Sequence, residues 1–125
     1  ENVWNNLWAP PEHFAAYVDS FNSPWIQAYF DIANHVKYGK PQKYVRALGD
    51  LIERVHVKDF QLKPSGHGGK FVPIGEGSVS YPAVMKALQE VGYTGWTTIE
   101  GRRGLSLPQL STRLDTILAG KKCRT

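Results

Sequence analysis

The sequence predicts an α/β fold in which parallel strands are joined by crossover helices. The first observation is alternation: four segments with helical periodicity are separated by three short apolar runs that have the length and composition of strands. The second is that the 125 residues contain no linker-like or low-complexity stretch, so they form one structural unit. Such alternation is typical of either a doubly wound sheet or a segment of a barrel, and periodicity alone leaves both open.

The first half of the chain supplies two helices and one strand. A helix is expected over residues 10–21, because two prolines open it and apolar residues recur on one face. The apolar run 25–30 is expected to be a buried strand that ends at Asp31. A second helix is expected over residues 41–51, with an apolar stripe made of Tyr44, Val45, Leu48 and Leu51.

The second half repeats this order. A short strand is expected over residues 54–59, followed by a glycine-rich loop at 64–69. A third helix is expected between Ser80, a suitable N-cap, and Gly92, which is placed to end it. A strand at 96–99 then leads to the last helix, whose start shows a serine and a glutamine in capping-box spacing.

Composition excludes several classes of protein. No apolar run approaches the ~18–20 residues that cross a bilayer, and the first residues show no signal-peptide pattern, so we expect a cytoplasmic protein without a membrane partner. A single cysteine, Cys123, gives neither a disulfide nor a cysteine-based metal site. The net charge of +4 is dispersed, apart from Arg102-Arg103 and the tail at 121–124, so we expect no nucleic-acid partner.

Three predicted strands each end in a side chain that can bind a metal: Asp31, His56 and Glu100. The C-terminal ends of parallel strands face one site, so these side chains should converge there. Glu1 precedes the first helix as the other three precede theirs, which makes it a fourth candidate. The residues alone also allow a turn-forming aspartate and a core histidine, so a site and a purely structural role both stay open.

Four stretches of the sequence carry a resemblance to a known family. They are Val55-His56-Val57-Lys58-Asp59, the stretch 71–79 with its Gly-Glu-Gly, the stretch 22–34 and the stretch 92–100. Together they resemble the sugar-phosphate isomerase/epimerase family of xylose isomerase-like barrels, and within it the L-xylulose-5-phosphate (hexulose-6-phosphate) 3-epimerases. The resemblance implies the C-terminal half of a (β/α)₈ TIM barrel over residues 1–125, from the end of strand 5 to helix 8, with about three parallel strands and four helices.

The resemblance also implies a metal site and a reaction. The positions that match the family's ligands are Glu1, Asp31, His56 and Glu100, and three carboxylates with one imidazole suit Mn²⁺ first, with Mg²⁺, Co²⁺ or Zn²⁺ as alternatives. In similar enzymes two glutamates move the proton of a ketose through an enediolate. Here they would be Glu1 and Glu100, and the partner would be a small sugar or sugar phosphate.

Other positions are expected to support that chemistry. Asn34, Glu76 and Arg102 are the candidates for substrate contact, whereas Lys58 and Asp59 are expected to form a salt bridge or to support the ligands. Aldose–ketose isomerisation, inosose dehydration and a non-catalytic barrel fragment are the alternative functions. The DNA-cleaving members of this superfamily bind a zinc cluster through many more histidines than the four present here, which argues against that activity.

A three-stranded piece of a barrel cannot close on itself. Both outer strands would expose unpaired backbone groups, and the inner face would expose Val55, Val57 and Ile99 or their neighbours. We therefore expect the chain to need either the missing N-terminal half of the barrel or self-association.

Overall fold

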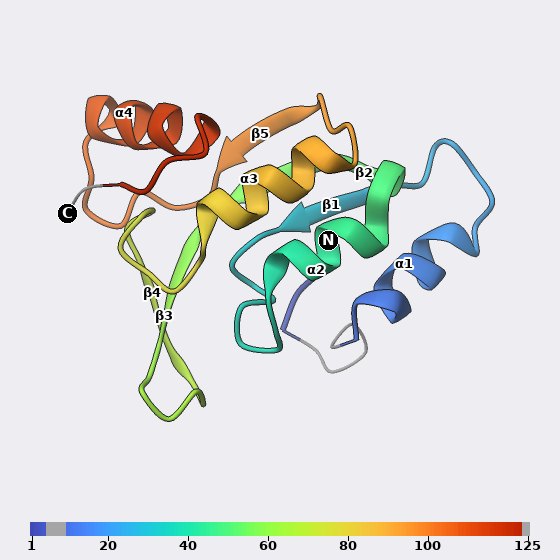
Figure 1. Ribbon diagram of the computed structural model, residues 1–125, viewed down its shortest axis with the longest axis horizontal. Helices are drawn as coiled ribbons and strands as arrows, with labels where there is room; N and C mark the ends of the chain where they lie inside the picture. The colour runs from blue at the N-terminus through green and yellow to red at the C-terminus, as the bar shows by residue number, and fades with distance from the viewer. Residues whose placement is uncertain (5–9, 124–125) are drawn as a thin grey trace.

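A parallel sheet covered on one face by helices forms the body of the molecule (Figure 1). The computed structural model describes residues 1–4 and 10–123. Its main sheet contains β1 (Ala28–Asp31), β2 (Ile52–Val57) and β5 (Trp96–Ile99), in the order β1-β2-β5 with both pairings parallel. The prediction of parallel strands with crossover helices is confirmed, and among the described residues the sheet does not close into a barrel.

The described residues form four α-helices, of which the second and third connect the strands of the sheet; each of the four has a proline in its first turn, where the missing backbone N–H costs no hydrogen bond. They are α1 (Pro11–Asp19), α2 (Pro41–Leu48, followed by the 3₁₀ turn η2, Gly49–Leu51), α3 (Tyr81–Glu90) and α4 (Leu107–Leu118). The capping box that opens α4 is present between Ser106 and Gln109. Ser80 occupies the N-cap of α3, but its side chain makes no capping hydrogen bond.

Side chains alternate between the two faces of the sheet, as the period of a strand requires. Phe30, Val55 and Val57 point toward the helices and are fully buried. The prediction named Val55, Val57 and Ile99 or their neighbours as exposed: the first two are buried and Ile99 is half-buried, and the open face belongs to their neighbours at the alternate positions. That face carries Tyr29 and Asp31 from β1, Arg54 and His56 from β2, and Trp96 and Thr98 from β5.

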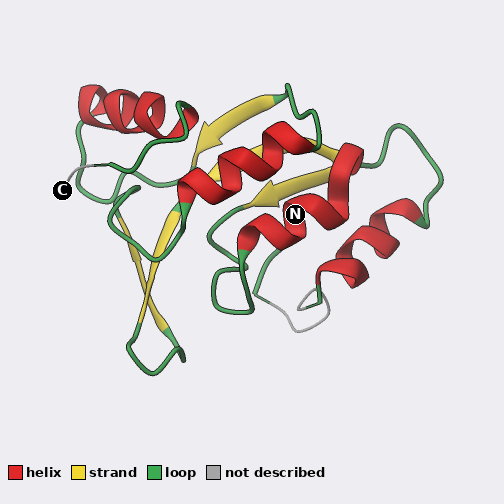
Figure 2. Ribbon diagram, viewed as in Figure 1, coloured by secondary structure: helices red, strands yellow, loops and turns green. Residues whose placement is uncertain are grey.

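Two predicted strands have different limits. The strand expected over 25–30 begins only at Ala28, and Trp25 is 92% exposed. The strand expected over 54–59 ends at Val57, and Asp59 instead opens a hairpin of β3 (Asp59–Leu62) and β4 (Gly69–Val72). The hairpin projects from the end of the sheet toward which the strand arrows point, and the predicted glycine-rich loop is its turn (Figure 2). Within the described ranges, no helix is both long and apolar enough to cross a membrane.

Candidate metal centre

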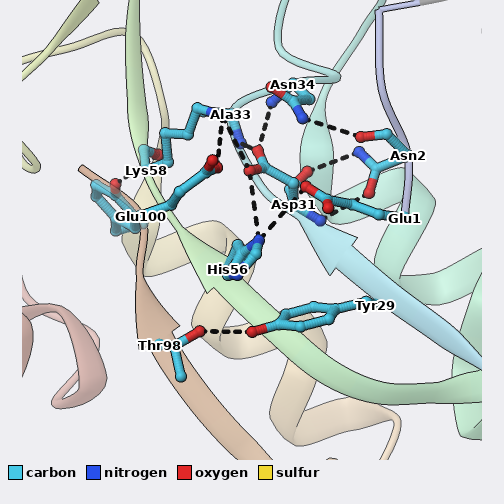
Figure 3. A network of polar contacts seen from close by, with 11 residues as sticks. Glu1, Asn2, Tyr29, Asp31, Ala33, Asn34, His56, Lys58, Thr98 and Glu100 are labelled. Carbon is cyan, nitrogen blue, oxygen red and sulfur yellow. Dashed lines mark hydrogen bonds and ion pairs between the residues drawn. The ribbon is translucent and has the colours of Figure 1, made fainter.

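The four predicted ligands lie together at the C-terminal edge of the sheet (Figure 3). Asp31 pairs with His56 in the register of β1 and β2, and the backbone N–H of Glu100 donates to the carbonyl of Val57 at the end of β2. One ligand atom from each of Glu1, Asp31, His56 and Glu100 lies within 4.8 Å of the other three.

This donor set fits a divalent cation. Ligands on opposite sides of an ion bound at about 2.1 Å lie about 4.2 Å apart, so the group closes on one ion with small shifts. Oδ2 of Asp31 is buried and accepts no hydrogen bond from any described residue, and it is ion-paired with Nζ of Lys58 at 3.4 Å, so it is an anionic oxygen that could serve as a ligand. Nδ1 of His56 lies 3.4 Å from Oε1 of Glu1 and 4.0 Å from Oδ2 of Asp31. A cation would relieve the repulsion among three neighbouring carboxylates.

Asp31 is the most constrained member of the group. Asp31 is 0% exposed, and its Oδ1 accepts hydrogen bonds from the backbone N–H groups of Ala33 at 2.9 Å and Asn34 at 2.7 Å. Burial raises the pKa of Asp31 to about 6, against the opposing effects of the Asn34 N–H and the Lys58 ammonium. The backbone thus fixes one oxygen and directs the other into the site.

Lys58 lies between two of the candidate ligands. Its Nζ is 2.7 Å from Oε2 of Glu100 and 3.4 Å from Oδ2 of Asp31, and its side chain is 12% exposed. The hydrogen bond from Lys58 lowers the pKa of Glu100 because it favours the ionised carboxylate, and this outweighs the opposing effect of partial burial. The salt bridge expected for Lys58 is present, and it holds a positive charge against the site.

Asn2 is a buried support of the candidate site that sequence reasoning missed. It is fully buried, and its side chain takes the place of a neighbouring strand: Nδ2 donates to the carbonyl of Asp31 at 2.8 Å, and Oδ1 accepts from the N–H of Asp31 at 2.6 Å. This amide bracket fixes Glu1 beside Asp31 (Figure 3). An asparagine outside any periodic pattern gives no signal in the sequence.

Below the ligands, Tyr29 and Thr98 support the imidazole of His56. The Tyr29 ring centroid lies 4.0 Å from that of His56, and the Tyr29 hydroxyl is 2.7 Å from Oγ1 of Thr98. Three adjacent strands thus hold the histidine ring from its own face of the sheet (Figure 3).

Asp59 has a structural role of a different kind from the expected salt bridge. It is 1% exposed and forms no ion pair among the described residues. Its carboxylate accepts four backbone hydrogen bonds of 2.9–3.3 Å, which come from Phe60, Gly75, Gly77 and Val79. A Cβ at Gly77 would collide with this carboxylate, so the Gly-Glu-Gly loop needs that glycine for close approach. Asp59 therefore ties the loop before α3 to the start of the hairpin.

The three residues predicted to contact substrate lie in different surroundings. Asn34 is next to the ligands, and its Nδ2 donates to the carbonyl of Asn2 at 2.9 Å. Glu76 lies outside the group of four and forms an ion pair with Arg113 of α4 at 2.7 Å. Nε of Arg102 donates to the carbonyl of Leu105, which braces the loop after β5.

Comparisons with known proteins agree with this architecture. The sequence model of the family described as "Xylose isomerase-like TIM barrel" matches residues 1–117. The L-ribulose-5-phosphate 3-epimerase UlaE of Escherichia coli O1:K1 / APEC is 39% identical over 85 residues, which cover 67% of this chain and 28% of UlaE.

Solved structures show the same fold. A D-tagatose 3-epimerase-like protein superposes with a TM-score of 0.75 and 26% identity, covering 94% of this chain and 44% of that protein. The IOLI protein, solved with a bound zinc atom, superposes with a TM-score of 0.74 at 17% identity. The match covers 90% of this chain and 45% of the IOLI chain. The chain thus spans between about a quarter and a half of the length of these proteins.

Proposed function

Because the chain belongs to the xylose isomerase-like TIM barrel family, we propose that it supplies the metal-binding half of a divalent-metal-dependent ketose 3-epimerase. The observation that carries the proposal is the convergence of Glu1, Asp31, His56 and Glu100 within 4.8 Å. The similarity to an enzyme named as an L-ribulose-5-phosphate 3-epimerase supports the choice of reaction. Mn²⁺ is the expected ion, with Mg²⁺, Co²⁺ and Zn²⁺ as alternatives.

Asp31 and His56 would hold the ion, with the two glutamates completing the set. When bound, a divalent ion acts as a Lewis acid toward the ketose carbonyl and the neighbouring hydroxyl. Epimerisation then requires one group to remove the proton of carbon 3 and another to return a proton to the opposite face. We assign these transfers to Glu1 and Glu100.

The charge state of Glu100 is compatible with a role as proton acceptor. The Lys58 ammonium lowers the pKa of Glu100 and keeps its carboxyl ionised, as a proton acceptor must be, while making it a weaker base. Asn34, Glu76 and Arg102 all stay predictions for substrate contact, and Asn34 is the one whose backbone is held beside Asp31.

Proton exchange tests the proposal directly. The assembled protein, loaded with Mn²⁺, is incubated with a ketose in deuterated water, and deuterium at carbon 3 is followed by NMR. We expect exchange that stops on chelation and returns with Mn²⁺. Exchange at the carbons of an aldose–ketose pair, or loss of water from the substrate, would instead indicate isomerisation or dehydration. A metal-loaded protein that exchanges no carbon-bound proton would refute an enzymatic role.

A further inference from the structure

Lys58 brings a positive charge to the candidate metal centre. It lies two residues after His56, and its side chain reaches the same group of ligands (Figure 3). Its Nζ is 2.7 Å from Oε2 of Glu100 and 3.4 Å from Oδ2 of Asp31. The ammonium thus lies against two of the four candidate ligands, which follow different strands of the sheet.

Two further contacts keep this lysine in place. The hydroxyl of Tyr81, a buried residue at the start of α3, donates to the backbone carbonyl of Lys58 at 3.0 Å. The ring of Phe71 in β4 lies 4.5 Å from Nζ, a cation–π contact. Lysines ordinarily extend their ammonium into water, but the side chain of Lys58 is largely buried. The ammonium is therefore a fixed part of the centre.

The charges of the centre match those of one divalent ion. When ionised, Glu1, Asp31 and Glu100 contribute three negative charges, and a histidine binds metal as a neutral imidazole. Lys58 cancels one of the three charges, so the centre keeps two. Uncompensated charge is costly around a buried carboxylate such as that of Asp31. A doubly charged ion leaves the centre neutral, and a triply charged ion does not.

We propose that Lys58 selects the charge of the bound ion, so that the centre accepts a divalent cation and disfavours a trivalent one. The inference rests on the metal site of the proposed function and adds a residue that determines which ions this site takes. Its physical basis is that the repulsion between the ammonium and an ion grows with the charge of the ion. A lysine that only fixed the position of Glu100 would act on both kinds of ion alike.

The ratio of two affinities tests this role. The assembled protein and its Lys58→Met variant, which keeps an apolar stem and loses the charge, are titrated by calorimetry with Mn²⁺ and, separately, with Tb³⁺. We expect the affinity for Tb³⁺ relative to that for Mn²⁺ to rise about tenfold in Lys58→Met, because the lost unit charge repels the trivalent ion more strongly. A misplaced Glu100 would weaken both affinities and leave their ratio unchanged.

Two variants serve as controls. Lys58→Arg keeps the positive charge and should keep the ratio of the parent protein. Lys43→Gln removes an exposed charge on α2, and solvent screening should leave the ratio unchanged there as well.

An unchanged ratio in Lys58→Met, or an equal rise in Lys58→Arg, would overturn the inference and reduce the role of Lys58 to a structural ion pair. A parent protein that binds neither ion would refute the metal centre itself, and the inference with it. Failure of the enzymatic role looks different, since the parent would then bind Mn²⁺ without exchanging any carbon-bound proton of a ketose. In that event the two titrations still decide the role of Lys58.

Discussion

At the scale of single residues, Glu100 and His56 belong to one centre but are expected to fail in different ways. Glu100→Gln keeps the side-chain volume and removes the group that accepts a proton. We expect carbon 3 exchange to drop at least about 100-fold, while a stoichiometric metal ion is still bound and the fold is kept. His56→Ala should lose metal affinity first, measured by equilibrium dialysis. Undiminished exchange in Glu100→Gln would exclude the two-glutamate mechanism.

The amide bracket of Asn2 leads to a second prediction. Asn2→Ala leaves the buried N–H and C=O of Asp31 without partners and releases Glu1 from its place. We expect a loss of about 1–3 kcal/mol in the free energy of unfolding, measured by denaturant titration. Metal binding should also weaken, measured by metal titration. An unchanged metal affinity would show that Glu1 is held by other means.

His35 should make stability depend on pH. It is 0% exposed among Phe14, Phe30, Tyr38 and Tyr44, its ring nitrogens have no hydrogen-bond partner among the described residues, and burial lowers its pKa to about 4. Between pH 6.5 and 4 the unfolded chain binds a proton that the folded chain excludes. Stability is therefore complete above pH 6.5 and falls by on the order of 3 kcal/mol as the pH approaches 4.

Comparing the parent with His35→Phe isolates this contribution. The free energy of unfolding, measured in urea at pH 7 and pH 4.5, should fall less in the variant than in the parent. An equal fall in the free energy of unfolding for both proteins would mean that His35 is protonated in the folded protein.

At the scale of elements, Asp59 joins the hairpin to the loop before α3. Each of its carboxylate oxygens accepts hydrogen bonds from two backbone N–H groups. In Asp59→Asn the side-chain NH₂ would replace one of these oxygens and face two N–H donors that it cannot accept. We expect unfolding to become easier by about 1–3 kcal/mol, measured by denaturant titration. Asp115→Asn on the exposed face of α4 is the control and should change little. An unchanged free energy of unfolding in Asp59→Asn would mean that water replaces the lost hydrogen bonds.

The elements that could be predicted are those with a clear period. Val55, His56 and Val57 alternate as a strand should, and the strand ends led directly to Asp31, His56 and Glu100. The apolar pair Trp25 and Ile26 was misleading, because exposed loops also carry large apolar side chains.

The hairpin and the supports of the site were beyond the sequence pattern. The start of β3 coincides with the end of the strand expected over 54–59, and the glycines between β3 and β4 suggest only a loop. Asn2 and the position of Lys58 depend on side-chain contacts between distant segments, which no local period encodes. Local sequence thus predicted the candidate ligands but not the contacts that hold them.

At the scale of the whole molecule, the open face of the sheet remains to be covered. Trp96 is 74% exposed on that face, and β1 and β5 are the outer strands. We predict that the 125 residues alone are not a stable monomer and are completed by the rest of a barrel or by another copy. Light scattering should show association or aggregation. A monodisperse 14.0 kDa monomer with a cooperative melt would contradict this.

The carboxylate of Asp59 has a consequence for hydrogen exchange. The four amides that it accepts belong to Phe60, Gly75, Gly77 and Val79, three of which lie outside any helix or strand. Loop amides ordinarily exchange with solvent quickly, but these four share one buried acceptor, so displacement of that carboxylate would release all of them. We therefore expect them to exchange slowly and with similar protection factors, as one opening unit before α3.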